Sequence, residues 1–175
     1  MRKAADQGFA PAQDDLGYLY REDPSVSGYS GKAELNAEAF RLHRLAAEQG
    51  NIIAMGDVGY CYMSGTGVGR DYGEALKWLR QAVAHDEPYA EAHLGEMYKN
   101  GWGVPQDDTE AVKWFRRSAD QGYRGGQYNL ALMLLEGRGV ARDRAAAEEL
   151  LSRSAEHEHP GARRELQRLR AAAEK

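Results

Sequence analysis

The sequence has little of several features that would assign a protein to a class. It contains a single cysteine, Cys61, so no disulfide can form within the chain and the fold must rest on packing. It also lacks a strong excess of one charge, since 23 basic side chains stand against 27 acidic ones, a formal net charge of -4. Because duplex nucleic acids are bound through basic patches, this balance argues against a nucleic-acid-binding protein.

Long apolar runs are missing as well. No stretch approaches the length of a bilayer-spanning helix, so the sequence predicts no transmembrane segment. The basic residues after Met1 are not followed by the apolar stretch of a secretory signal peptide. With 42% hydrophobic and 29% charged residues the composition is that of a globular protein. The location stays open between cytoplasmic and periplasmic.

What the chain does contain is an internal repeat. Four segments, at 16–20, 58–62, 94–98 and 130–134, carry similar residues in the same order, beginning Leu-Gly, Val-Gly, Leu-Gly and Leu-Ala. The second, third and fourth segments start 36 residues apart, whereas the first precedes the second by 42. A fixed period of this size predicts a solenoid, in which each repeat buries its apolar face by stacking on its neighbours. Such proteins usually hold other molecules rather than transform them.

Each repeat is predicted to form two helices. The first helices are expected over 12–21, 54–63, 90–100 and 126–136. Ala90, Leu94 and Tyr98 show their pattern, since residues four apart share one helix face. The glycine that follows the central aliphatic residue, as at Gly95, costs about 1 kcal/mol in a helix, so a close helix–helix approach is expected there.

A glycine turn and a second helix complete the repeat. The turns read Gly-x-Gly-Val, and Asp71 and Asp107 are predicted to cap the helices that follow. Those second helices carry an Ala-x2-Trp face in two repeats, and two of the four close on glycine, at Gly50 and Gly122. Asp86 and Glu158 replace the closing glycine, which predicts either strain at those two helix ends or a different exit of the chain.

We expect one repeat domain over 1–175. Its parts are the end of a truncated unit at 1–8, a first repeat at 9–50 with an insertion at 21–31, further repeats at 51–87, 88–123 and 124–159, and a C-terminal capping helix at 160–175. The truncated unit is expected because Ala5-Asp6-Gln7-Gly8 matches the closing sequence of a repeat.

The combined pattern Ala-x3-Leu-Gly-x2-Tyr, Gly-x-Gly-Val-x2-Asp and Ala-x2-Trp resembles the Sel-one-like repeat family, a relative of the tetratricopeptide repeats. The resemblance covers nearly the whole chain. It implies an all-α fold, a right-handed α-solenoid of antiparallel helix pairs that forms a superhelix like that of tetratricopeptide proteins. It also implies an adaptor or scaffold with a protein or peptide partner, often in bacterial signalling, and no cofactor.

By similarity to tetratricopeptide arrays, one face of the first helices lines a concave groove. The positions opposite the Leu/Tyr stripe supply the predicted partner-binding residues, which are Asp14, Tyr18, Tyr60, Met63, Glu96, Lys99, Tyr128 and Leu132. Exposed apolar and aromatic side chains of this kind often mark interaction sites. The alternative is that these residues bury one another.

Several chemical signatures have a structural interpretation instead. The glycine-rich turn 65–70 resembles a phosphate-binding loop but follows a helix and recurs in other repeats. His157 and His159 would point apart unless the helix has ended before them, and His43 and His93 have no paired Cys, Asp or Glu at ligand spacing. Cys61 is expected to be a packed thiol. We therefore predict no catalytic residue and no metal site.

The leading hypothesis is a non-enzymatic protein–protein interaction scaffold that binds a peptide or partner protein in its concave groove. One alternative is an exported binder or modifier of a small cell-wall or β-lactam-like ligand, as for some cysteine-rich members of the wider family, although this chain lacks their cysteine pairs. Another is an immunity or inhibitor protein for a single effector.

Overall fold

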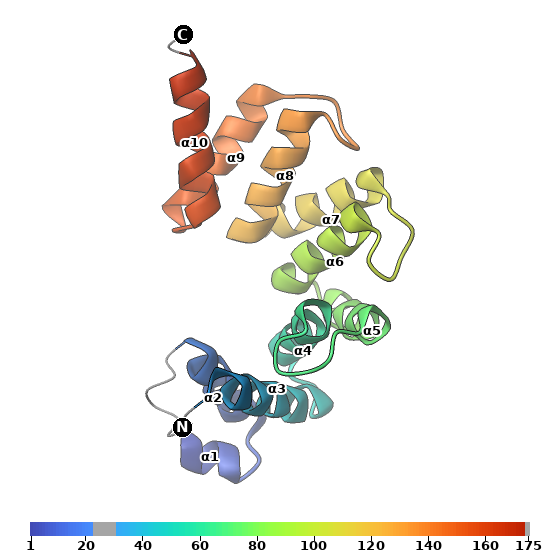
Figure 1. Cartoon of the computed structure of the whole chain (residues 1–175), viewed down its shortest axis with the longest axis vertical. Helices are drawn as coiled ribbons and strands as arrows, with labels where there is room; N and C mark the ends of the chain where they lie inside the picture. Colours follow the sequence, from blue (N-terminus) through green and yellow to red (C-terminus); the bar gives the residue numbers. More distant parts are fainter. Residues whose placement is uncertain (23–30, 174–175) are drawn as a thin grey trace. The chain divides into compact units, whose positions relative to one another are not determined.

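The computed structural model describes residues 1–22 and 31–173, and all of the regular secondary structure in these residues is helical (Figure 1). The helices are α1 (Arg2–Asp6), α2 (Ala10–Glu22), α3 (Lys32–Glu48), α4 (Ile52–Ser64), α5 (Tyr72–Val83), α6 (Pro88–Asn100), α7 (Asp108–Asp120), α8 (Arg124–Glu136), α9 (Arg144–Glu156) and α10 (Pro160–Ala173). Among these helices, none is long and apolar enough to cross a bilayer. Most of the predicted insertion at 21–31 lies outside the described residues.

The helices form two compact units, residues 1–90 and 91–175, and each is described by itself. In the first unit α1 packs on α2, α2 on α3, α3 on α4 and α4 on α5. In the second, α7 packs on α8, α8 on α9 and α9 on α10. Short connections make consecutive helices antiparallel. The predicted fold class, an all-α solenoid of antiparallel helix pairs, is therefore confirmed. That the repeats form one domain stays a prediction.

The predicted helix starts are capped by the expected side chains. Asp71 accepts hydrogen bonds from the backbone N–H groups of Gly73 and Glu74, and Asp107 does the same at the start of α7. The helix α4 begins two residues before the predicted position, because the Asn51 side chain accepts a hydrogen bond from Ala54 N–H and so caps the helix earlier.

The helical glycines permit the close approach that the sequence predicted. A Cβ built on Gly59 would lie 2.7 Å from Leu79, and one built on Gly95 would lie 2.6 Å from Phe115. Leu79 and Phe115 are fully buried residues of the second helices. The first helices α4 and α6 therefore each receive a large core side chain of their partner helix against bare backbone.

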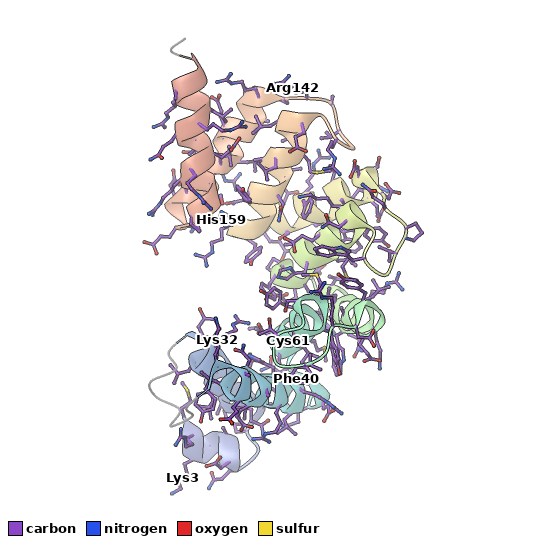
Figure 2. The ribbon with its side chains drawn as sticks, viewed as in Figure 1. Lys3, Lys32, Phe40, Cys61, Arg142 and His159 are labelled. Atoms are coloured by element: carbon purple, nitrogen blue, oxygen red, sulfur yellow. The ribbon has the colours of Figure 1, made fainter. Side chains whose placement is uncertain are left out.

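Within each unit, successive repeats meet through the second glycine of a turn. A Cβ on Gly67 would clash with the backbone oxygen of Asn36 in α3, and one on Gly139 would clash with that of Asp108 in α7. In the second unit Arg138, beside this glycine, donates to Asp108 at 2.7 and 3.0 Å. In the first unit, the Phe40 ring, labelled in Figure 2, meets Tyr62 of the next repeat edge-on at 5.3 Å. Stacking of repeats in register is thus visible within each unit.

The closing positions of the second helices all have left-handed backbone. Gly50 and Gly122 have φ of 89° and 83°, which glycine adopts without penalty. Asp86 and Glu158 stand at the equivalent positions with φ of 56° and 61°. The strain predicted for these two helix ends is therefore present. The chain leaves them in the same left-handed conformation as at the two glycines.

Candidate partner-binding surface

The structure separates the eight predicted surface residues by exposure. Tyr18 is exposed, with 54% of its surface accessible. Asp14 and Met63 are buried, with 8% and 6% of their surfaces accessible. The sequence shows which residues share a helix face, but it does not show which of them the neighbouring helices cover. The half-buried members are Tyr60, Glu96, Lys99, Tyr128 and Leu132.

In the first unit an arginine lies beside two tyrosines, and a third tyrosine packs against one of these two. The guanidinium carbon of Arg21, on α2, lies 5.4 Å from the ring centre of Tyr18 and 5.9 Å from that of Tyr60 on α4. The Tyr60 ring is 6.1 Å from the ring of Tyr89, at the start of α6. These distances suit cation–π and aromatic contacts. We call Tyr18, Arg21, Tyr60 and Tyr89 the tyrosine–arginine surface.

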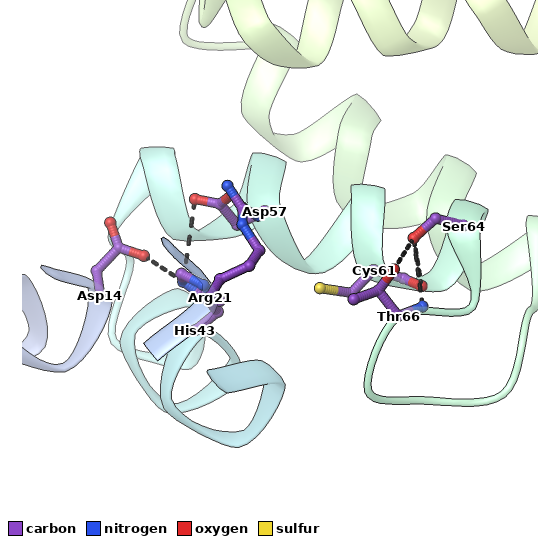
Figure 3. Close-up of polar contacts among 7 residues, drawn as sticks. All are labelled: Asp14, Arg21, His43, Asp57, Cys61, Ser64 and Thr66. Atoms are coloured by element: carbon purple, nitrogen blue, oxygen red, sulfur yellow. Dashed lines mark hydrogen bonds and ion pairs between the residues drawn. The ribbon is translucent and has the colours of Figure 1, made fainter. Parts of the chain in front are cut away.

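Asp57 on α4 holds Arg21 in place, with 3.3 Å between its Oδ1 and the arginine Nη1 (Figure 3). Burial lowers the pKa of Arg21, but the charge and hydrogen bond of Asp57, together with Tyr89 and Cys61, outweigh burial and the pKa is raised above its usual value. The guanidinium therefore stays charged. Burial also raises the pKa of Asp57, although His43 and Arg21 act in the opposite direction.

A buried polar cluster lies beneath Arg21 (Figure 3). His43 on α3 is fully buried, and its Nδ1 lies 2.7 Å from Asp14 Oδ1 and 3.9 Å from Asp57 Oδ2. On its other side, a Cβ on Gly17 would lie 3.0 Å from the imidazole. The nitrogen Nε2 has no hydrogen-bond partner among the described residues. The His43 imidazole thus packs between Gly17 and the carboxylates of Asp14 and Asp57.

Sequence reasoning missed this cluster. The search for acids near His43 used spacing along one helix, whereas Asp14 and Asp57 come from α2 and α4. A signal was present in the repeat register. His43 occupies the position at which the later repeats carry the fully buried core residues Leu79, Phe115 and Leu151.

The three side chains of this cluster, two carboxylates and an imidazole, are of types that can bind a metal ion. One atom each from Asp14, His43 and Asp57 lies within 4.8 Å of the others. However, the positively charged guanidinium of Arg21 is already paired with the Asp57 carboxylate. A metal ion would have to share that carboxylate with the guanidinium, which like-charge repulsion disfavours. The cluster is better described as an internal ion-pair network.

Cys61 lies one helical turn beyond Asp57 and is buried, as predicted for a packed thiol (Figure 3). Burial, with a further contribution from Asp57, raises the pKa of the Cys61 thiol to about 12. The thiolate needed for nucleophilic attack is therefore scarce near neutral pH. Ser64, nearby in Figure 3, donates to Thr66 Oγ1 at 2.8 Å and helps to close α4.

Two predicted surface residues of the second unit, Glu96 and Tyr128, make internal contacts. Glu96 is paired with His93 Nδ1 at 3.0 Å and accepts from Asn129 at 3.3 Å. Burial raises the pKa of Glu96, but the hydrogen bond and charge of His93, together with Asn129 and Lys99, outweigh burial and the pKa is lowered. Tyr128 stacks on His159 with ring centres 4.4 Å apart. The glutamate and the tyrosine thus also stabilise the unit itself.

Comparisons with known proteins agree with this architecture. A Sel1 repeat protein from Oxalobacter formigenes is 34% identical, with a TM-score of 0.80 over 94% of this chain and 63% of its own. A protective antigen of uropathogenic Escherichia coli with an SLR fold, c5321, is 37% identical, with a TM-score of 0.73 over 92% of this chain and 33% of its own. The rat protein named DAP3-binding cell death enhancer 1 is 33% identical over 92 residues, which are 52% of this chain and 16% of the rat protein. This chain therefore spans less than two thirds of the length of each.

A family model described as Sel1 repeat matches residues 10–51, 52–86, 88–123 and 125–159. Proteins of this family generally mediate protein–protein interactions and are helical-repeat scaffolds that are generally not enzymes. The match covers most of the sequence and repeats the register seen in the helix pairs. The chain belongs to the Sel1 repeat family.

Proposed function

We propose that this chain is a non-enzymatic scaffold that binds a protein or peptide partner on the tyrosine–arginine surface of its first unit. Tyr18 and Tyr60 are the members of this surface that the sequence had singled out, and Arg21 and Tyr89 are added by their contacts with them. Nucleic acid is not expected as the partner because the chain has no excess of basic residues.

The observation that carries the proposal is the fixed position of Arg21 between the rings of Tyr18 and Tyr60. Tyrosine and arginine are enriched among the residues that dominate binding energy at protein interfaces. A side chain that is already held, as Asp57 holds Arg21, loses less conformational entropy when a partner binds. The surface therefore offers aromatic contact area that is largely preorganised.

A non-enzymatic role is supported by the burial of the two most reactive side-chain types in the first unit. His43 is fully buried and engaged with Asp14, so it does not reach a bound molecule. Cys61 is buried and has a raised pKa. Both side chains fit a packed interior better than a catalytic site.

A peptide-display selection against the full chain tests the proposal. The affinity of the enriched peptides is then measured for the wild type, for Tyr18→Ala and for the control Ile53→Ala. Ile53 lies on α4 of the same unit, and its large side chain is 60% exposed. We expect Tyr18→Ala to weaken the enriched peptides at least 10-fold and Ile53→Ala to leave them within about 2-fold. Both variants should unfold at the wild-type temperature, because both side chains are mostly exposed.

The proposal fails if the enriched peptides bind Tyr18→Ala as well as the wild type. It also fails if Ile53→Ala weakens them as strongly as Tyr18→Ala does, since the contact would then lie elsewhere on the unit. Tyr60→Phe provides a finer comparison, because it keeps the ring beside Arg21 and removes only the hydroxyl. It should retain most of the affinity.

A further inference from the structure

The second unit contains a pocket of about 480 Å³ between α7 and α9, over α8. Its apolar lining comes mainly from Leu130, Leu134, Val140 and Leu150. The charged side chains that line it are two arginines, Arg116 and Arg142, and two aspartates, Asp120 and Asp143. Arg142, labelled in Figure 2, stands in the connection between α8 and α9. The volume falls within the range of pockets that hold small ligands or single side chains.

The repeat register explains why a pocket opens at this place. Three lining residues are smaller than their counterparts 36 and 72 residues earlier in the chain. The replacements are Leu134 for Tyr62 and Tyr98, Ala146 for Glu74 and Glu110, and Leu150 for Trp78 and Trp114. The last repeat has therefore lost two aromatic rings and a carboxylate from one side of its helix pair.

In the first unit the equivalent positions include two large aromatic residues. There Tyr62, Val68 and Trp78 pack against the core cluster that contains Val58. Their counterparts Leu134, Val140 and Leu150 surround the pocket of the second unit. We propose that this pocket receives an aromatic side chain, preferably tryptophan, from a partner peptide, which takes the place of the rings that the last repeat lacks.

The arginines favour an aromatic occupant over an aliphatic one. A guanidinium stacks on an electron-rich ring, and indole is the best acceptor of this contact. The preceding repeat shows the arrangement, because the Arg117 guanidinium carbon lies 4.9 Å from the ring centre of Trp114. Arg116 and Arg142 can do the same for a ring in the pocket, while the leucine lining removes the ring's faces from water.

This site is separate from the tyrosine–arginine surface and does not rest on the function proposed for it. All of its lining residues lie within 116–150, in the second unit. Tyr18→Ala is therefore expected to leave the pocket unchanged, and so a failure of either proposal can be told from a failure of the other.

The test is a titration of the full chain, with labelled leucine and valine methyl groups, by N-acetyl-L-tryptophanamide. Methyl resonances of Leu134 and Leu150 should shift and saturate, with a dissociation constant on the order of 1 mM, as expected for a ligand of this size. Methyl resonances of Val58 and Leu79, in the core of the first unit, serve as the internal control and should not move. N-acetyl-L-leucinamide should bind at least 5-fold more weakly.

Two variants fill the pocket with the residues of the other repeats. Leu150→Trp should abolish the saturable shifts and keep the unfolding temperature at or above that of the wild type. Ala146→Glu restores the glutamate of the earlier repeats, at a position whose N–H is already capped by Asp143, and should weaken binding at least 3-fold. If Leu150→Trp does not fold, the binding of the tryptophan probe to Ala146→Glu tests the proposal.

Three results would overturn the proposal. The first is the absence of saturable shifts at Leu134 and Leu150 up to about 10 mM of the tryptophan probe. The second is unchanged binding in a folded pocket-filling variant, or equal binding of the leucine probe. The third is clearly tighter binding of free indole than of N-acetyl-L-tryptophanamide, since the pocket would then suit a free aromatic compound and not a peptide side chain.

Discussion

The Nδ1 atom of His43 lies 2.7 Å from Oδ1 of Asp14, in a core position that the later repeats fill with leucine or phenylalanine. The first repeat has thus exchanged an apolar contact for a buried charged or polar one. Such exchanges rarely increase stability, because two groups must leave water to form one pair. Once the pair is present, however, removing one member leaves the other buried without its partner.

A double-mutant cycle on this pair is our first prediction. His43→Leu and Asp14→Ala should each lower the free energy of unfolding by about 1–3 kcal/mol, because each leaves a buried polar group without its partner. The combined variant should cost less than the sum of the two by at least ~1 kcal/mol. Urea denaturation of the four proteins measures this coupling.

Asp15→Ala is the matched control for the cycle. Asp15 follows Asp14 on α2 but is exposed, so its replacement should change the free energy of unfolding by less than about 0.5 kcal/mol. Additive effects of the two mutations in the pair, to within about 0.5 kcal/mol, would mean that the short contact contributes no coupling.

The second prediction concerns the pH dependence that Asp57 produces. Its pKa is raised above the usual 3.8, so between that value and the folded-state pKa the native protein holds a proton that the unfolded chain has released. Stability from this group is therefore lost as pH rises through the window. Asp57→Asn should show a smaller loss of unfolding free energy between about pH 4 and about pH 7 than the wild type does, as measured by urea denaturation across that range.

Glu96 provides a control of opposite sign. Its pKa is lowered from 4.5, so its contribution is present above that value and is lost as pH falls through the folded-state pKa. Glu96→Gln should therefore reduce the loss of stability on acidification below about pH 4.5, whereas Asp57→Asn should not. The same direction of change in both variants would contradict the assignment for one of the two carboxyl groups.

The fold could be predicted from the sequence because its main determinants are local and recur. The glycine of each first helix, the turn glycines and the capping aspartates keep their spacing, and a stacked architecture buries them in equivalent ways. Even the strained helix ends at Asp86 and Glu158 were visible as departures from a repeated glycine. Because the repeats are equivalent, the role of each position could be inferred from several copies of it.

The site was harder to predict because exposure and pairing depend on other helices. Asp14 and Tyr18 are one helical turn apart on α2, yet one is buried against His43 and the other is exposed. The position of Arg21 between two tyrosines depends on the placement of α4, which the sequence of α2 alone does not reveal. Comparing the repeats for what differs, as well as for what recurs, would have identified both His43 and Leu150.

The third prediction tests the close contact between α6 and α7. Gly95→Ala would place its Cβ about 2.6 Å from Phe115, a fully buried ring. Overpacking of this kind costs about 1–3 kcal/mol, and this outweighs the gain of about 1 kcal/mol in helix propensity. Urea denaturation should show a net loss of stability. As control, Gly69→Ala meets nothing within 4 Å and should be neutral or stabilising by about 0.4–1 kcal/mol.

The last prediction exchanges residues between two equivalent helix ends. Glu158 has φ of 61°, which strains a residue with a Cβ by about 1–2 kcal/mol, and its carboxylate makes an exposed contact of 4.0 Å with Arg163 that contributes little. Glu158→Gly should therefore stabilise the chain by about 0.5–1 kcal/mol after the added freedom of the unfolded chain is subtracted. Gly122→Glu should destabilise it by about 1–2 kcal/mol, because φ is 83° and open space around the Cβ leaves only the backbone penalty. Opposite shifts in the urea midpoint are expected; shifts of the same sign would show that side-chain contacts, and not the left-handed backbone, determine stability at these ends.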